Sequence, residues 1–181
     1  MKILETERLL LTDYKLESLD DFFKLKACNE VWNYSTFTPL KEKYQAKILL
    51  ENLIKDRKND KYVFMALYKK DTGEFIGEAG IIGHTPHNNR CVVGYNLLPE
   101  YWNHGYATEI TKGIVKYAFE SLGFERIEAL ALQINIASCK VLEKSGFICE
   151  GVLRNFARFK RSYNNVCYYG IISPDYFTYR I

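Results

Sequence analysis

The chain has no long apolar stretch that would place it in a membrane. No uninterrupted apolar run reaches about 18 residues, the length that a membrane-spanning helix needs. Near the N-terminus, Glu5, Glu7 and Arg8 interrupt the stretch in which a secretory signal would need apolar residues. We therefore expect a cytoplasmic protein with no membrane partner.

Paired cysteines and a strong excess of one charge are also missing. The five cysteines (Cys28, Cys91, Cys139, Cys149 and Cys167) are odd in number and form no CxxC pair, so neither a disulfide framework nor a zinc knuckle is predicted. Reduced thiols are the simplest expectation. The formal net charge of +3 is too small to indicate a specific nucleic-acid partner.

What the chain does contain fits an ordinary globular protein. Hydrophobic residues make up 48% of its 181 residues and charged residues 26%, a balance typical of globular domains. A domain of this length buries about 70% of the surface that its unfolded chain exposes, so it needs no metal or disulfide to fold. No linker, repeat or low-complexity segment interrupts the sequence, and we interpret residues 1–181 as one domain.

Hydrophobic patterns predict helices and strands in a mixed order. The clearest helix covers 107–122, where apolar residues recur with the helical period and Gly123 is placed at the C-terminal cap. Further helices are predicted at 22–27, 41–58 and 135–144, strands at 8–12, 62–68, 74–82, 91–98, 127–134, 147–153 and 163–172, and a loop at 84–90. The order β, α, β, α, β after a hairpin implies a mixed sheet with helices packed on its faces.

A strand-to-helix turn at residues 99–109, PEYWNHGYATE, carries a possible anion site. The first turn of a helix presents unpaired backbone N–H groups and a partial positive charge, which together favour a phosphate. Gly105 permits close approach to the backbone, Ala107 leaves the next turn uncrowded, and Thr108 carries a hydroxyl donor. Neither a GxGxxG nor a GxxxxGK[ST] pattern is present. A glycine that only shapes a tight turn explains this segment alone equally well.

Three ordered motifs carry a family resemblance. They read GYNLLPEYWNHGYATEI at 94–110, YAFESLGFERIEA at 117–129 and NIASCKVLEKSGFICEGVLR at 135–154, after an opening TERLLLT at 6–12. Together they resemble the GNAT acetyltransferase superfamily, and within it the RimJ/RimL-like branch, which acetylates protein N-termini including those of ribosomal proteins. The resemblance implies an α+β fold, whose central mixed, largely antiparallel sheet has helices on both faces and two splayed parallel strands.

The resemblance also implies the ligands. Acetyl-CoA would be the acyl donor, with no metal, and an amine the acceptor, in a monomer or homodimer. Backbone amides of the turn would hold the coenzyme pyrophosphate, at Trp102, Asn103, His104, Gly105, Tyr106, Ala107 and Thr108. Trp102 replaces the usual Gln or Arg and Asn103 replaces a common Gly, so we expect reshaped phosphate contacts rather than a lost site.

Acetyl transfer needs a donor for the developing oxyanion and a group that stabilises the leaving thiolate. The resemblance implies a bulge in the strand before the turn, with a backbone N–H at Asn96, Leu97 or Leu98 polarising the thioester carbonyl. It also implies that Asn135 contacts the pantetheine arm and that Ser138 hydrogen-bonds the leaving sulfur. The alternative interpretation is that Asn135 and Ser138 are only a helix N-cap and a first-turn residue.

The general base is the least specified part. Glu78 on the predicted return strand and His84 after it are candidates, although Glu78 can equally be a solvated strand residue. His84 and His87 form an HxxH pair, but without a helix or a third ligand a metal site is not predicted. Many relatives have a Glu where Val92 stands, so a water relay through that acid is not expected here.

Two further features have alternative interpretations. Cys139 suggests an acetyl-cysteine intermediate, but with no paired histidine a small buried helix residue is favoured. A basic cluster suits an acidic substrate, the coenzyme 3′-phosphate, RNA or simply solvent, and consists of Arg154, Arg158, Lys160 and Arg161.

The expected activity is direct acetylation of a primary amine, most simply a protein N-terminal α-amine. Acetylation of an antibiotic or a polyamine is the alternative within enzymes, and a non-catalytic acyl-CoA sensor is the alternative outside them.

Overall fold

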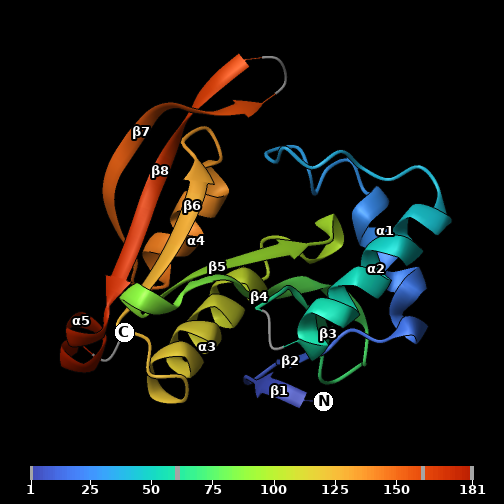
Figure 1. The fold of residues 1–181 in the computed structure, drawn as a ribbon, viewed down its shortest axis with the longest axis horizontal. Helices are drawn as coiled ribbons and strands as arrows, with labels where there is room; N and C mark the ends of the chain where they lie inside the picture. Colours follow the sequence, from blue (N-terminus) through green and yellow to red (C-terminus); the bar gives the residue numbers. More distant parts are fainter. Residues whose placement is uncertain (1, 60–61, 160–161, 180–181) are drawn as a thin grey trace.

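One mixed sheet organises the chain. The computed structural model describes residues 2–59, 62–159 and 162–179. Eight strands follow the order β1-β2-β3-β4-β5-β6-β8-β7 (Figure 1). Their bounds are β1 Lys2–Glu5, β2 Leu9–Thr12, β3 Met65–Lys69, β4 Phe75–Thr85, β5 Arg90–Leu97, β6 Arg126–Leu132, β7 Ile148–Phe159 and β8 Ser162–Ile172. Among the described strands, β5 and β6 pair in parallel and all other neighbours are antiparallel.

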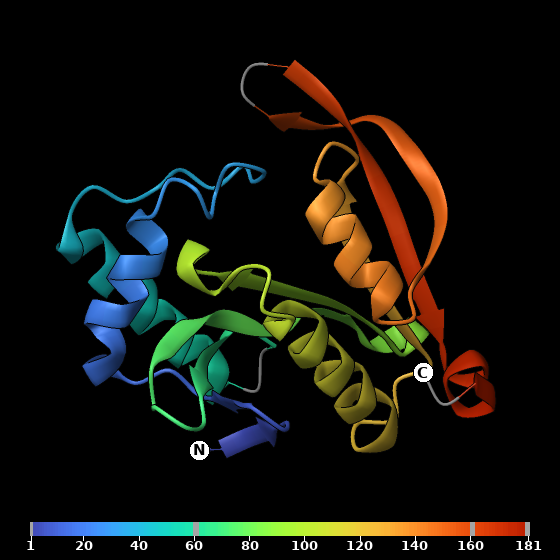
Figure 2. The same ribbon diagram turned by 180° about the vertical axis from the view of Figure 1, so that it is seen from behind.

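Helices cover both faces of this sheet. They are α1 Leu19–Ala27, α2 Lys43–Lys58, α3 Tyr106–Glu120, α4 Ile136–Lys144 and α5 Ser173–Tyr179. Adjacent strand residues point to opposite faces: Ala66 packs with α1 and α2 in one core, whereas Leu67 packs with α3 and α4 in the other. Figure 2, seen from behind, shows α3 and α4 side by side along the sheet, away from α1 and α2.

The predicted fold class is confirmed, with differences at the element ends. Helix α3 buries Ile110, Ile114 and Phe119 along one stripe, as its periodicity predicted. The prediction of a loop over 84–90 was wrong at its start, because His84 and Thr85 extend β4 by pairing with β5. Strand β7 extends beyond the predicted 147–153, and the sequence analysis missed β1 and α5.

The parallel strands separate soon after they meet. Pairing of β5 with β6 is limited to Arg90 with Arg126, Cys91 with Ile127 and Val92 with Glu128. Beyond Val92, β5 stays paired with β4, while β6 stays paired with β8. Strands β6, β7 and β8 therefore turn away from the rest of the sheet (Figure 1), and the expected splay is present.

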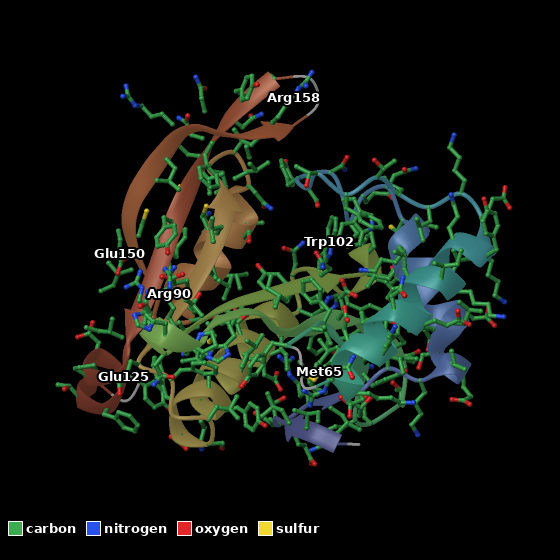
Figure 3. The ribbon with its side chains drawn as sticks, in the orientation of Figure 1. Met65, Arg90, Trp102, Glu125, Glu150 and Arg158 are labelled. Carbon is green, nitrogen blue, oxygen red and sulfur yellow. The ribbon has the colours of Figure 1, made fainter. Side chains whose placement is uncertain are left out.

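An ionic network lies where these strands join. Arg90 Nη1 and Arg126 Nε each donate to Glu128 Oε1 at 2.8 Å, and Arg126 Nη1 donates to Glu150 Oε1 at 2.8 Å. Burial alone would raise the pKa of Glu128, but hydrogen bonds from Tyr168, Arg126 and Arg90 bring that pKa below its usual value. The network links β5, β6 and β7 at the closed end of the splay (Figure 3).

We expect Glu128→Gln to lower the free energy of unfolding by about 2–3 kcal/mol at pH 7, because it leaves two guanidinium groups without their shared carboxylate. The folded pKa of Glu128 is lowered, so its contribution is complete above the unfolded value of about 4.3 and is lost as the pH falls through the folded value. Urea unfolding should therefore show the difference from wild type narrowing below about pH 4.3.

Glu125→Gln is the matched control, because Glu125 is an exposed carboxylate in the loop just before β6. It should change stability by less than about 0.5 kcal/mol. Equal losses in both variants would show that Glu128 has no special role in joining the strands.

Candidate active site

The opening between the splayed strands contains a cavity of about 80 Å³. Strands β5 and β6 and helices α3 and α4 line it, with Tyr95, Thr111 and Ser138 as its hydroxyl-bearing residues. The Tyr95 hydroxyl and Ser138 Oγ are 3.2 Å apart. Burial raises the pKa of Tyr95, and the Ser138 hydrogen bond partly opposes that rise. The sequence analysis missed Tyr95. Its place two residues from each of the buried Val93 and Leu97 indicated that all three side chains share one face of the strand.

Asn135 and Ser138 form the helix cap that was one of the two interpretations of the sequence. The Asn135 side-chain oxygen accepts a hydrogen bond from the Ser138 N–H at 3.2 Å, so Asn135 is the N-cap of α4. The Asn135 amide nitrogen and the Ser138 hydroxyl are not used by this cap. Capping therefore leaves both groups available to a ligand.

The turn before α3 presents the open end of a helix. Gly105 is the N-cap with a left-handed φ of 80°, and no side chain caps it. The first backbone hydrogen bond of the helix runs from Glu109 N–H to the Gly105 carbonyl at 3.0 Å. The N–H groups of Tyr106, Ala107 and Thr108 therefore have no partner within the helix. This geometry fits an anionic ligand.

The two departures from the family pattern have structural explanations. Asn103 has a φ of 61°, and Asn is one of the few residues other than Gly that enter this region readily. Trp102 Nε1 donates to the Leu97 carbonyl at 2.7 Å, and His104 Nδ1 lies 2.6 Å from the Trp102 carbonyl. Trp102, labelled in Figure 3, thus ties the turn to the end of β5.

The backbone at the end of β5 differs from the expected bulge. The register of β4 against β5 is interrupted between Ile81 and Gly83, so the extra residue lies on β4 and the predicted bulge at Asn96–Leu98 was wrong. Leu98 N–H donates to Ile76 on β4 at 2.9 Å. Because neighbouring residues in a strand direct their N–H groups to opposite edges, Leu97 N–H faces the opening. The Leu97 carbonyl also faces the opening, since it accepts a hydrogen bond from Trp102 Nε1.

Glu78 is fully buried, which excludes the solvated interpretation. Its Oε1 accepts hydrogen bonds from Lys26 Nζ at 2.7 Å and Asn96 Nδ2 at 2.8 Å, and its Oε2 accepts from the Tyr14 hydroxyl at 3.3 Å. Burial and the negative charge of Glu78 raise the pKa of Tyr14 well above its usual value. Lys26 is buried too, with Nζ 4.7 Å from the centre of the Trp32 ring. These three donors argue against the predicted role of Glu78 as general base.

The other candidate base is an exposed histidine packed against aromatic rings, and the candidate nucleophile is buried. His84 pairs with Cys91 near the closed end of the splay, and its ring packs against Tyr62 and Phe124. Within the described ranges, no three His, Cys, Asp or Glu side chains form a group that could hold a metal ion. Cys139 is buried, and its thiol lies 3.9 Å from the Leu132 carbonyl.

The remaining sequence candidates lie at the edges of the site. Val92, where the resemblance implies an acid in many relatives, pairs with Glu128 across the parallel strands. Glu128 therefore places a carboxylate beside this position, but Arg90 already holds it. Arg154 and Arg158 are exposed on β7, while Lys160 and Arg161 of the predicted basic cluster lie outside the described residues. No helix in the described parts of the chain is long and apolar enough to cross a membrane.

Comparison with known proteins identifies the family. Residues 8–148 match the model of an acetyltransferase (GNAT) domain. The chain belongs to the GNAT acetyltransferase family. A curated relative, the uncharacterized N-acetyltransferase YoaA of Bacillus subtilis, is 30% identical over 95% of this chain and 97% of its own.

Solved structures share the fold at lower identity. RimL, a ribosomal L7/L12 alpha-N-protein acetyltransferase in complex with coenzyme A, has a TM-score of 0.85 at 17% identity over 95% of this chain and 98% of that one. Spermidine N-acetyltransferase from Vibrio cholerae, in complex with coenzyme A and spermine, has a TM-score of 0.82 at 18% identity, covering 93% and 98%. The GNAT chain is thus an acyl-CoA-dependent N-acetyltransferase with acetyl-CoA as its acyl donor.

Substitution at Asn103 should test the geometry of the turn. Asn103→Val should raise the KM for acetyl-CoA roughly 10-fold with little change in kcat, because a β-branched residue resists the left-handed conformation. Asn103→Gly should keep KM within about twofold. Steady-state kinetics with acetyl-CoA as the varied substrate measures both.

Asn155→Val is the matched control, because Asn155 also has a left-handed φ, of 53°, but lies on β7. It should reduce stability without changing the KM for acetyl-CoA. A normal KM in Asn103→Val would contradict the assignment of this turn to the coenzyme.

Proposed function

We propose that this GNAT enzyme acetylates the α-amine of a protein or peptide N-terminus by direct attack on acetyl-CoA. The observation that carries the proposal is the state of the carboxylates on strands β4, β5 and β6. These described strands contribute Glu78 and Glu128, both buried. Glu78 is paired with Lys26, and Glu128 is paired with Arg90 and Arg126. Neither is placed to take a proton from a strongly basic amine.

Such a site favours an acceptor that is already partly neutral. An α-amine has a pKa of about 7.7–8.0, so a substantial fraction is unprotonated near neutral pH. A lysine-like primary amine has a pKa of about 10.4, and less than about 0.1% of it is unprotonated at pH 7. Water can accept the proton that the α-amine loses after attack, so this acceptor needs no dedicated base.

The charges around the opening also disfavour a polyamine. A cationic acceptor is best recognised by unpaired carboxylates, and both strand carboxylates already have basic partners. Residues 151–172 contain Arg154, Arg158, Lys160 and Arg161 but no Asp or Glu. The fold does not decide between acceptors, since both a ribosomal-protein and a spermidine acetyltransferase share it.

For the donor, we assign the diphosphate to the backbone amides of Trp102–Thr108, at the uncapped N-terminus of α3. The Leu97 N–H, which faces the opening, would polarise the thioester carbonyl. Asn135 would donate its free amide hydrogens to the pantetheine arm. Glu78 would act as a positioning residue that, with Lys26, holds the Asn96 side chain at the edge of β5.

Tyr95 and Ser138 would stabilise the leaving group. As the amine nitrogen bonds to the acetyl carbon, the carbon–sulfur bond breaks and leaves a coenzyme thiolate, whose conjugate thiol should have a pKa of about 8.5. A serine hydroxyl is too weak an acid to protonate it fully, but hydroxyl donors 3.2 Å apart can both hydrogen-bond it. The amine proton then leaves through water, and the thiolate is free to take one up.

Direct attack is favoured over an acetyl-cysteine intermediate by the state of Cys139. Its thiol is buried near the Leu132 carbonyl, and the titratable side chains that hydrogen-bond it are Tyr169 and Cys167 rather than a histidine or a carboxylate. A nucleophilic cysteine needs such a base or a lowered pKa. The amine would therefore meet the thioester itself.

Acceptor choice is testable by thiol release. With acetyl-CoA and equal concentrations of acceptor at pH 7.5, peptides with free N-termini should give a kcat/KM at least about 100-fold above spermidine, as the neutral fractions predict. Mass spectrometry should place the acetyl group on the α-amine. Preference for spermidine would overturn the proposed acceptor. If the protein bound coenzyme A but released no thiol with any acceptor tested, it would be a sensor rather than an enzyme. Acetyl-CoA alone should leave the protein mass unchanged.

The hydroxyl pair predicts a separation of kinetic constants. Ser138→Ala and Tyr95→Phe should each lower kcat roughly 10- to 100-fold while leaving the KM for acetyl-CoA within about threefold, because they act on the developing thiolate. The double variant should lose less than the product of the two effects, since each hydroxyl orients the other.

Tyr176→Phe is the matched control, because it removes a tyrosine hydroxyl that is hydrogen-bonded to Glu120 outside the cavity. Its kcat should stay near wild type. If Tyr95→Phe also left kcat unchanged, Tyr95 would have no part in stabilising the thiolate.

A further inference from the structure

Arg8 reaches the coenzyme turn from a distant part of the sequence. It lies just before β2, and its Nε donates to Glu109 Oε2 at 2.6 Å. Its Nη1 donates to the His104 carbonyl at 3.1 Å, and its guanidinium carbon lies 4.6 Å from the centre of the Tyr106 ring. Three contacts with the turn and the first helical residues thus fix the plane of this guanidinium.

The third guanidinium nitrogen borders the uncapped end of α3. Nη2 lies 3.5 Å from the position that a Cβ would occupy on Gly105. Among the described residues, no acceptor is hydrogen-bonded to Nη2, and about 45% of the Arg8 side chain is exposed. An N–H donor with a full positive charge therefore lies beside the backbone amides that we assign to the diphosphate.

The turn itself supplies no cation. Residues 99–106 contain neither Lys nor Arg. Glu109, in the first turn of α3, would repel a diphosphate if its charge were uncompensated. Burial alone would raise the pKa of Glu109, but hydrogen bonds from Thr6 and Arg8 hold that pKa below its usual value. Arg8 thus compensates the charge of Glu109 through Nε, and its Nη2 stays available for a ligand.

We propose that Arg8 is a diphosphate-binding residue of the coenzyme site, with Nη2 donating to a diphosphate oxygen while Glu109 and His104 hold the guanidinium in place. Arginine suits this role because its fork can serve a carboxylate and a phosphate at once. The proposal rests on the placement of the diphosphate at this turn in the proposed function. It does not depend on which amine is the acceptor.

The first test is binding of coenzyme A without any acceptor, by titration calorimetry. Arg8→Gln should weaken the Kd roughly 10- to 100-fold, as expected for loss of a charge-assisted hydrogen bond. Dephospho-coenzyme A, which lacks the 3′-phosphate but keeps the diphosphate, should show the same loss. Arg8→Lys keeps the charge without the fork and should fall between wild type and Arg8→Gln.

A donor without the diphosphate separates this role from a general structural one. With S-acetyl-pantetheine, the kcat/KM of Arg8→Gln should equal that of wild type, each measured with the best acceptor found. An equal loss with both donors would show that Arg8 only maintains the fold. Unchanged binding of coenzyme A in Arg8→Gln would also overturn the proposal.

Glu109→Gln is the matched control for the ion pair. If Arg8 acted only by clamping α3 through Glu109, breaking the pair from either side would weaken the Kd equally. We expect Glu109→Gln to weaken the Kd less than Arg8→Gln does, because it loosens the hold on the guanidinium but keeps the Arg8 charge beside the diphosphate. Failure to acetylate peptides would leave these binding results unaffected, so the two proposals can fail separately.

Discussion

The structure depends on two parallel strands, β5 and β6, that pair only briefly before they diverge. A strand edge without a neighbour presents backbone N–H and C=O groups that must find other partners. Strands β5 and β6 pair over only three residues before each follows its antiparallel neighbour. The edge of β5 beyond Val92 is thus left open, and Trp102 satisfies the carbonyl of Leu97 there. In the proposed function, the Leu97 N–H at the same edge polarises the acyl thioester.

The arrangement of charge keeps this opening stable and nearly neutral. At the closed end, Glu128 lies between two arginines and holds the strands together. On the face covered by α1, Lys26 neutralises the buried Glu78, which would otherwise carry a large desolvation penalty. At the helix end, Arg8 neutralises Glu109. Compensating these three carboxylates leaves the N–H groups of α3 as a positive end, which supports the proposed diphosphate site.

Local sequence patterns predicted the elements that form the donor site. The period of 107–122 predicted α3, Asn135 predicted the cap of α4, and Gly105 predicted a tight turn, because each feature depends on neighbours within about one helical turn. The bulge was misplaced onto β5, since which strand carries an extra residue depends on the register with β4. Glu78 was equally hard to place, because its partners lie 18, 52 and 64 residues away.

The same distinction explains why the donor is better specified than the acceptor. The assigned groups for acetyl-CoA, apart from Arg8, come from the continuous segment between β5 and the start of α4, so a short motif records them. The acceptor groove that we expect would draw on α1 and on β7 and β8, which lie far apart in the sequence and share no motif. Even so, chemistry constrains this side. A site whose strand carboxylates, Glu78 and Glu128, are both compensated does little to deprotonate an amine, which supports the proposed α-amine acceptor because it deprotonates readily in water. In the proposed function, the acceptor is thus selected by its own pKa more than by any residue that the motif could have revealed.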